Sequence, residues 1–225
     1  MIALRHFATL ALFWAAAGAA WPSESTTNKT AEWWSTLPDP ALAECVKTLA
    51  AENGWHQPTD VKSLSCHSQS IRSLAGIEQL SQLESLSLHN NQLTEVSIQN
   101  LPQLQRLALS RNRLSALHLQ NVPQLSELYI FDNALTLLEL ADMPKLALLK
   151  GNANQLTAFH YRQLPALAKI YLFNNKLPDI DIDHLPALRY MDVRQNPMPD
   201  ELYQRMDSMR SVTFLHDGNA PDWKQ

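Results

Sequence analysis

The stretch Leu104-Gln-Arg-Leu-Ala-Leu-Ser-Arg-Asn-Arg-Leu114 decides the fold, because the pattern behind it returns at regular intervals along the chain. That pattern is Leu-x-x-Leu-x-Leu-x-x-Asn-x-Leu, and each copy starts 21 residues after the previous one, without insertion or deletion. The copies begin at Leu83, Leu104, Leu125, Leu146, Leu167 and Leu188. A strict period of this length predicts stacked units, each of which buries the apolar side of its neighbours.

The period and the pattern together are typical of leucine-rich repeats, in which each unit adds one short strand to a curved parallel sheet. On the other side of each unit, two apolar residues alternate with polar ones and a proline follows at a fixed place. These prolines are Pro102, Pro123, Pro144, Pro165 and Pro186. Because proline lacks an amide donor and fixes φ, this side is expected to be extended. We predict a leucine-rich repeat solenoid: a curved parallel β-sheet of about eight short strands with an extended, helix-poor convex side and an N-terminal helical cap.

A helix is predicted immediately ahead of the repeats. Asp39 can accept hydrogen bonds from the free amides of a helix start, Pro40 suits the first helical position, and Gly54 can end the helix. A solenoid needs such a cap, since its first strand would otherwise leave the core and a sheet edge open.

The pattern changes after the sixth repeat. Asp200 is predicted to be the N-cap of a short helix. A last strand is predicted to follow, with Val212 and Phe214 placed one period of 21 residues beyond Met191 and Val193. The helix and the strand would together close the far end of the core.

Five segments are expected along the chain. Residues 1–20 have the features of a secretory signal peptide, because Arg5 precedes an apolar stretch that ends in small residues. The other segments are a flexible leader over 21–38, an N-terminal cap helix over 39–60, leucine-rich repeats over 61–198, and a C-terminal cap and tail over 199–225. We expect an exported monomer, periplasmic or extracellular, that is not inserted in a membrane once the signal is removed.

The chain has two cysteines, Cys45 and Cys66. Cys45 lies on the apolar face of the predicted cap helix, and Cys66 takes the inward position of a degenerate first repeat. An even pair in an exported protein predicts a disulfide, with a free nucleophile or half of a metal site as the alternatives. The disulfide would tie the cap to the sheet and stabilise the fold by about 3 kcal/mol in the chain-entropy model.

One asparagine per repeat stands where the chain turns off the strand. An asparagine side chain both donates and accepts, so a stack of them can satisfy backbone groups that the turns would leave buried and unpaired. We predict a structural ladder made of Asn91, Asn112, Asn133, Asn154, Asn175 and Asn196.

Charge and motifs argue against several classes of function. The chain has 18 Lys and Arg residues against 22 Asp and Glu residues, a formal net charge of -4, and the basic residues are scattered. Nucleic acids and anionic membranes need them gathered on one face, so neither partner is expected. There is no Ser-His-Asp order and no phosphate-binding glycine loop, and His67 and His89 lack a third metal ligand. We predict a protein that is not an enzyme and has neither cofactor nor metal.

The residues between the inward leucines of each strand face the concave side. Serine, alanine and histidine fill these positions in the first repeats, whereas aromatic residues gather in the later ones, with charges of both signs around them. Such a patch is typical of protein-binding surfaces. The predicted ligand-binding residues are Tyr129, Phe131, Lys150, Asn152, Lys169, Tyr171, Phe173, Tyr190, Asp192 and Arg194. The alternative is a self-contained ladder, in which Lys150 stacks on Tyr129 and Tyr171 and only stabilises the sheet.

Gly151 takes an inward position that other repeats fill with a large apolar residue. Either the strand bulges there and shapes a pocket, or Leu148 or Leu149 repacks into the space.

Together, the Asp39-Pro40 helix start, the entry segment Ile71-Arg-Ser-Leu-Ala-Gly-Ile77 and the six repeats resemble bacterial secreted leucine-rich repeat proteins of the internalin type. Members of that family typically bind other proteins through the concave face, and the resemblance implies the same here. The chain has no immunoglobulin-like module and no Leu-Pro-x-Thr-Gly sorting signal after the repeats, so surface display and an adhesin role are not expected.

We therefore expect an exported, non-enzymatic binding module that recognises a protein ligand through the aromatic patch on its concave face. The alternatives are a structural or assembly component of the cell envelope, acting through the convex face or the leader, and a glycan-binding protein that uses the same aromatic residues.

Overall fold

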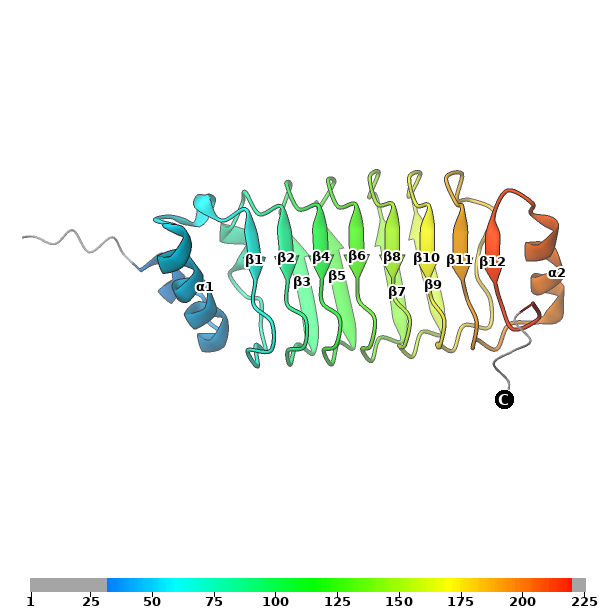
Figure 1. Cartoon of the computed structure of the whole chain (residues 1–225), viewed down its shortest axis with the longest axis horizontal. Helices are drawn as coiled ribbons and strands as arrows, with labels where there is room; N and C mark the ends of the chain where they lie inside the picture. The colour runs from blue at the N-terminus through cyan, green and yellow to red at the C-terminus, as the bar shows by residue number, and fades with distance from the viewer. Residues whose placement is uncertain (1–31, 220–225) are drawn as a thin grey trace, which may run out of the picture.

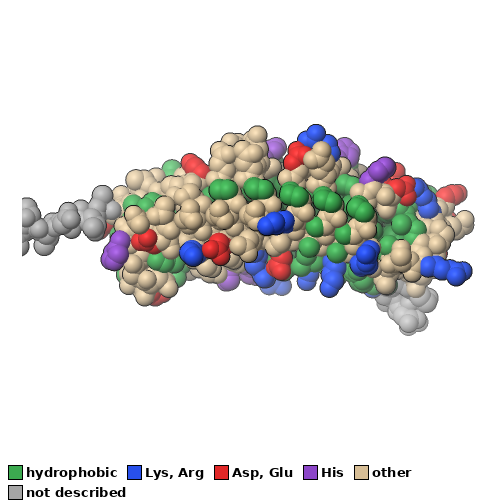
Figure 2. All heavy atoms as spheres, turned by 90° about the horizontal axis from the view of Figure 1, so that it is seen from above, with side chains coloured by type: hydrophobic (Ala, Val, Ile, Leu, Met, Phe, Trp, Pro, Cys, Tyr) green, Lys and Arg blue, Asp and Glu red, His purple; other side chains and the backbone are tan. Residues whose placement is uncertain are grey.

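The structure, a computed structural model, describes residues 32–219. The expected signal peptide at 1–20, most of the expected leader and the end of the expected tail lie outside these residues. Within them the chain forms an elongated solenoid with a helix near each end (Figure 1). Seen from above in Figure 2, hydrophobic side chains recur along the solenoid with acidic and basic side chains between them.

One parallel sheet of eight strands runs along the solenoid, in the order β1-β2-β4-β6-β8-β10-β11-β12. Its strands are β1 Ser63–Ser65, β2 Ser85–Ser87, β4 Arg106–Ala108, β6 Glu127–Tyr129, β8 Leu148–Lys150, β10 Lys169–Tyr171, β11 Tyr190–Asp192 and β12 Thr213–Leu215. Neighbouring repeats pair in register, so that Leu107 lies opposite Leu86 on one side and Leu128 on the other. The predicted fold is confirmed.

The convex side is extended, as predicted. It contains β3 Glu95–Gln99, β5 Ala116–Gln120, β7 Leu137–Ala141 and β9 Ala158–Arg162. These strands form two separate parallel pairs, β3 with β5 and β7 with β9. Between the two sides lies one continuous core of stacked apolar side chains, most of them fully buried. Burial of this kind is what holds successive repeats together.

The N-terminal cap is helix α1, Pro40–Asn53, and both of its ends follow the prediction. The Asp39 carboxylate accepts from the amides of Ala41 and Leu42, and Gly54 ends the helix in a left-handed conformation with φ 69°. Glycine is suited to that place because it has no Cβ to oppose a positive φ.

Asp39 also joins α1 to the first repeat. Its second carboxylate oxygen accepts from the backbone N–H groups of Arg72 at 2.8 Å and Ser73 at 2.9 Å. Burial acts to raise the pKa of Asp39, but the four backbone donors together outweigh it and hold the pKa below its usual value. The carboxylate is therefore both a helix cap and a tie between two elements.

Part of the expected leader is folded. Trp33–Thr36 form a 3-10 helix, η1, and Trp33 and Leu37 are buried in the core. Two further 3-10 helices, η2 Pro58–Asp60 and η3 Ile77–Gln79, lie in the entry to the repeats. The cap is therefore larger than α1 alone, because these apolar side chains find burial against it.

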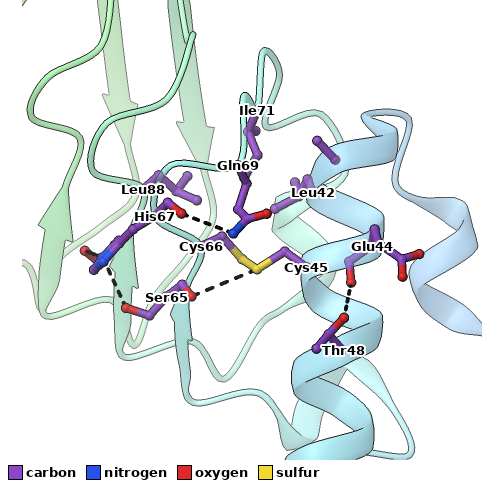
Figure 3. The surroundings of a disulfide bond; sticks show 12 residues. Leu42, Glu44, Cys45, Thr48, Ser65, Cys66, His67, Gln69, Ile71 and Leu88 are labelled. Carbon is purple, nitrogen blue, oxygen red and sulfur yellow. Dashed lines mark hydrogen bonds between the residues drawn. A yellow bond between two sulfur atoms is a disulfide. The ribbon is translucent and has the colours of Figure 1, made fainter.

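The predicted disulfide between Cys45 and Cys66 is confirmed. The sulfur atoms are 2.00 Å apart and the Cα atoms 6.1 Å apart. In Figure 3 the bond runs from α1 to the residue after β1, beside Ser65 and Gln69. It ties the cap to the first strand of the main sheet.

The C-terminal end departs from the prediction in two ways. Helix α2 spans Asp200–Ser208 with Pro199 as its N-cap, so Asp200 is the first helical residue and the prediction that it caps the helix was wrong. In β12, Phe214 lies opposite Met191, and Val212 precedes the strand. The expected spacing of 21 residues fails because α2 replaces an extended segment, and a helix covers only about 1.5 Å per residue against about 3.3 Å in a strand.

The asparagine ladder is confirmed from the first repeat to the last. Asn154 shows the arrangement: its Oδ1 accepts from Leu135 N–H at 3.1 Å, and its Nδ2 donates to the carbonyls of Ile130 at 3.0 Å and Gly151 at 3.1 Å. Each ladder residue therefore links its own turn to the repeat before it. The same arrangement recurs at Asn91, Asn112, Asn133, Asn175 and Asn196.

Neither predicted arrangement at Gly151, a bulge or the repacking of Leu148 or Leu149, was correct. The strand does not bulge, since Gly151 N–H donates to the Tyr171 carbonyl at 2.8 Å in the regular ladder. The space is filled by the repeats on either side: an added Cβ would lie 3.0 Å from Leu172 Cδ2 and 3.7 Å from Ile130 Cγ1. Close packing of the core across repeats therefore removes the expected hole.

Candidate binding surface on the concave face

The ten residues predicted to bind a ligand come from β6, β8, β10 and β11 or from the residues just after these strands. In β6, β8 and β10 the middle residue is buried and both flanking side chains point to the outer, concave face. We call the ten residues the concave patch: Tyr129, Phe131, Lys150, Asn152, Lys169, Tyr171, Phe173, Tyr190, Asp192 and Arg194. Nine of them are partly or fully exposed, and Asp192 is not.

The centre of the concave patch is a row in which Lys150 lies between two tyrosines. The register places Lys150 opposite Tyr129 on β6 and Tyr171 on β10. Its ammonium Nζ lies 5.7 Å from the centre of the Tyr129 ring and 5.1 Å from the centre of the Tyr171 ring. Both distances are within the range of a cation–π interaction. The predicted cross-strand stacking is therefore present, while all three side chains remain partly exposed.

Arg106 and Glu127 extend this row toward the N-terminal repeats. The Arg106 guanidinium lies over the Tyr129 ring at 4.7 Å, and it forms an ion pair of 2.9 Å with Glu127. The Tyr129 hydroxyl donates to Glu127 at 2.8 Å. Burial and then the Glu127 carboxylate raise the pKa of Tyr129, so the phenol keeps its proton. Our prediction omitted Arg106, although its place beside the Tyr129 column could have indicated it.

A second aromatic pair continues the patch across the next two strands. The rings of Tyr171 and Tyr190 have centres 5.0 Å apart, and Lys169 lies opposite Tyr190 in the register. Burial, and then the charge of Asp192, raise the pKa of Tyr190. Lys169 is exposed. The packed rings of Tyr171 and Tyr190 therefore lie beside the accessible ammonium group of Lys169.

Asp192 is buried beneath the concave patch and holds Arg194 by hydrogen bonds. It is only 2% exposed, and it accepts from Arg194 Nε at 2.9 Å and from a terminal guanidinium nitrogen at 2.6 Å. The hydrogen bonds that Asp192 accepts from Arg194 raise the pKa of the guanidinium, which keeps its charge. The guanidinium lies 6.0 Å from the centre of the Phe173 ring. Asp192 thus orients Arg194 instead of facing a ligand, which the sequence did not indicate.

Phe131 borders a less polar part of the face. Its ring centre lies 6.4 Å from that of His89, and Ser110, just after β4 in the repeat between them, is only 2% exposed. The Ser110 hydroxyl has no hydrogen-bond partner within residues 32–219. Burial, and then the charges of Arg111 and His67, lower the pKa of His89, so its ring is neutral at physiological pH.

The N-terminal part of the face is rich in hydroxyl groups. His67 Nε2 lies 2.7 Å from Ser87 Oγ and 3.3 Å from Ser65 Oγ, and its ring meets His89 edge-on at 6.0 Å. In the part of the chain that the structure describes, no three histidine, cysteine or acidic side chains are placed to hold a metal ion. The sequence had not indicated that the histidine is bonded to these serines.

The convex side has a separate depression between the two strand pairs. It has a volume of about 450 Å³ and lies along β5 and β7, next to Leu137, which is 44% exposed. No helix among residues 32–219 is long and apolar enough to cross a membrane.

Solved structures share this fold. Internalin C2 from Listeria monocytogenes is 21% identical, with a TM-score of 0.52 over 80% of this chain and 94% of that chain. YopM from Yersinia enterocolitica is 21% identical, with a TM-score of 0.54 over 78% of this chain and 40% of that one. These likenesses confirm the resemblance to internalin-type bacterial proteins in fold. Comparison with curated protein sequences gave no significant match.

A family comparison gives the more specific result. Residues 37–155 match the family described as the leucine-rich repeat domain of endo-beta-N-acetylglucosaminidase EndoS. The match extends over more than half of the chain, from the end of η1 through the asparagine turn that follows β8. This protein therefore belongs to the family of EndoS-type leucine-rich repeat domains.

Proposed function

We propose that this protein is an exported, non-enzymatic binding module that holds a protein ligand on the concave patch. The leucine-rich repeat fold supports a binding module in general. The observation that carries the proposal is the continuous series of side-chain contacts from Tyr129 through Lys150 and Tyr171 to Tyr190, across four neighbouring strands. Since neighbouring strands lie about 4.8 Å apart, the series spans about 15 Å.

Stacking within the row supports binding as well as stability. The rings and the Lys150 stem are held in one arrangement before a ligand arrives, so little side-chain entropy is lost on binding. Tyrosine and arginine are the residue types that contribute most to protein interfaces.

A protein ligand fits the patch better than a glycan does. Sugars stack on open aromatic faces, but Tyr129 already has Arg106 at 4.7 Å and Lys150 at 5.7 Å from its ring centre. Tyr171 likewise has Lys150 and Tyr190 beside it. The patch therefore offers ring edges, hydroxyls and charges, which suit a polypeptide surface.

Two further observations support export and a non-catalytic role. The Cys45–Cys66 disulfide is the kind of bond that persists in an oxidising compartment, which is either the periplasm or the exterior. The His67 imidazole lies beside the Ser87 hydroxyl. Within the described residues, no carboxylate is bonded to the imidazole to orient it as a base.

The test is a capture experiment from envelope and culture supernatant. Wild type is compared with a Tyr129→Ala, Phe173→Ala variant and with a convex control, Leu137→Ala, His118→Ala. We expect the concave variant to lose a protein that wild type and the control both retain, with all three still folded by thermal melting. Identical captured proteins for the three would contradict the proposal.

A structural or assembly role in the cell envelope is the second candidate. It is favoured by the exposed Leu137 beside the convex depression. In the same experiment, this role predicts that the convex control alone loses its partner.

A further inference from the structure

The concave face differs in charge from the molecule as a whole. The chain has a formal net charge of -4. The outward positions from β4 to just after β11 hold four basic side chains, Arg106, Lys150, Lys169 and Arg194, but only two acidic ones, Glu127 and Asp192. The concave face is therefore basic, whereas the charges on the rest of the protein sum to a negative value, so the basic character is local to this face.

The two acidic side chains are already engaged within the sheet. Glu127 accepts from the Tyr129 hydroxyl at 2.8 Å and pairs with Arg106 at 2.9 Å. Asp192 is buried and pairs with Arg194 at 2.6 Å. Each therefore compensates an arginine and leaves the lysines uncompensated.

Lys150 and Lys169 have no carboxylate partner among residues 32–219. Lys150 is held between the Tyr129 and Tyr171 rings, and Lys169 stands exposed beside Tyr190. The two lysines lie on neighbouring strands, and Lys169 is two residues before the residue that pairs with Lys150. Their Cα atoms are therefore about 8 Å apart. Tyr171 lies opposite Lys150 and on the same strand as Lys169, so it is a neighbour of both lysines.

We propose that the ligand of the concave patch is an acidic protein segment in an extended conformation, with two carboxylates two residues apart placed over Lys150 and Lys169. The side chain between the two carboxylates points away from the sheet, because successive side chains of an extended chain alternate in direction, and the backbone of that residue passes over Tyr171. Alternate side chains of an extended chain repeat every 6.6 Å or so, which long glutamate and lysine side chains can match to this spacing. This inference rests on the proposed function, because it names the chemistry of the ligand at the same site.

The test uses short fluorescein-labelled peptides of glycine and serine that carry Glu-Tyr-Glu, Gln-Tyr-Gln or Lys-Tyr-Lys at the centre. Binding to the full protein is followed by fluorescence anisotropy at about 50 mM salt, where screening of exposed charges is weak. The variant is Lys150→Met, Lys169→Met, which keeps the apolar stems and removes the charges. The control is Lys145→Met, Lys176→Met, in which each lysine contacts only a glutamine in the described residues.

We expect the Glu-Tyr-Glu peptide to bind wild type and the control about tenfold more tightly than it binds the Lys150, Lys169 variant. The Gln-Tyr-Gln peptide should bind wild type about tenfold more weakly, and Lys-Tyr-Lys more weakly still. Equal binding of the three peptides, equal loss in variant and control, or no Glu-Tyr-Glu binding to wild type at about 1 mM would overturn the inference.

The capture experiment separates this inference from the proposed function. If the Tyr129, Phe173 variant loses its protein while the Lys150, Lys169 variant captures it unchanged, the concave patch binds a ligand that is not acidic. If the aromatic variant captures the same proteins as wild type, the proposed function itself fails.

Discussion

One residue in each repeat, just before the ladder asparagine, is held in the left-handed region with φ between 54° and 58°. These residues are Asn90, Arg111, Asp132, Ala153, Asn174 and Gln195. Asparagine and aspartate enter this region with little strain, because their short polar side chains can bond locally. Ala153 has no such compensation, so the turn imposes a strained conformation on it.

Replacing Ala153 by glycine should therefore stabilise the protein. We expect Ala153→Gly to raise the free energy of unfolding by about 1 kcal/mol, measured by denaturant titration. The matched control is Ala158→Gly in β9, where the backbone is extended and glycine should cost about 0.5–1 kcal/mol. If Ala153→Gly destabilised as much as Ala158→Gly, strain at this turn would not be significant.

Single-residue roles on the concave patch were only partly predictable from the sequence. The 21-residue period assigns every residue to a column, so the positions of Tyr129, Lys150 and Tyr171 follow from arithmetic. The period does not predict which rotamer a side chain adopts or which neighbours it contacts. The burial of Asp192 under Arg194 and that of the Ser110 hydroxyl depend on such contacts, and only the structure places them.

Among the elements, α1 depends on a single carboxylate. Asp39 accepts hydrogen bonds from four backbone amides, two in the helix and two in the first repeat. Its pKa is lower in the folded state than the usual value of about 3.9, so its contribution to stability is present above that pH. The contribution is lost as the pH falls through the folded pKa, because the protonated group accepts fewer hydrogen bonds.

Substitution of Asp39 should change both stability and its dependence on acid. We expect Asp39→Asn to lower the free energy of unfolding by about 2 kcal/mol at pH 7, and to flatten the loss of stability below about pH 4. Thermal melts across this range measure both effects. Asp200→Asn is the control, because Asp200 lies in the first turn of α2 without a side-chain cap bond in the described residues. An unchanged acid profile in the Asp39 variant would refute the tie between α1 and the first repeat.

The two caps also show where sequence rules for elements succeed and fail. The start and end of α1 follow from local chemistry, Asp39 and Pro40 at one end and Gly54 at the other, so they were predictable. The register of β12 was not, since α2 interrupts the period and moves Phe214 opposite Met191. Periodicity predicts an element only as long as every turn of the solenoid uses the same backbone path.

At the scale of the whole molecule, stability depends on the inward side of the strands, and the binding that we propose uses the outward side. Inward leucines and the asparagine ladder join the repeats, and the disulfide ties the cap to the first strand. The outward residues can then vary without weakening the core. In this chain, the outward positions between Tyr129 and Arg194 are rich in aromatic residues and lysines.

The most direct test of the concave patch is site-specific photo-crosslinking with p-benzoylphenylalanine. The photoreactive residue replaces Phe173 on the concave patch or, in a matched variant, His160 on the outer face of β9. We expect a crosslinked protein from position 173 in envelope or culture supernatant and none from position 160. The same crosslinked protein from both positions, or one from position 160 alone, would contradict it.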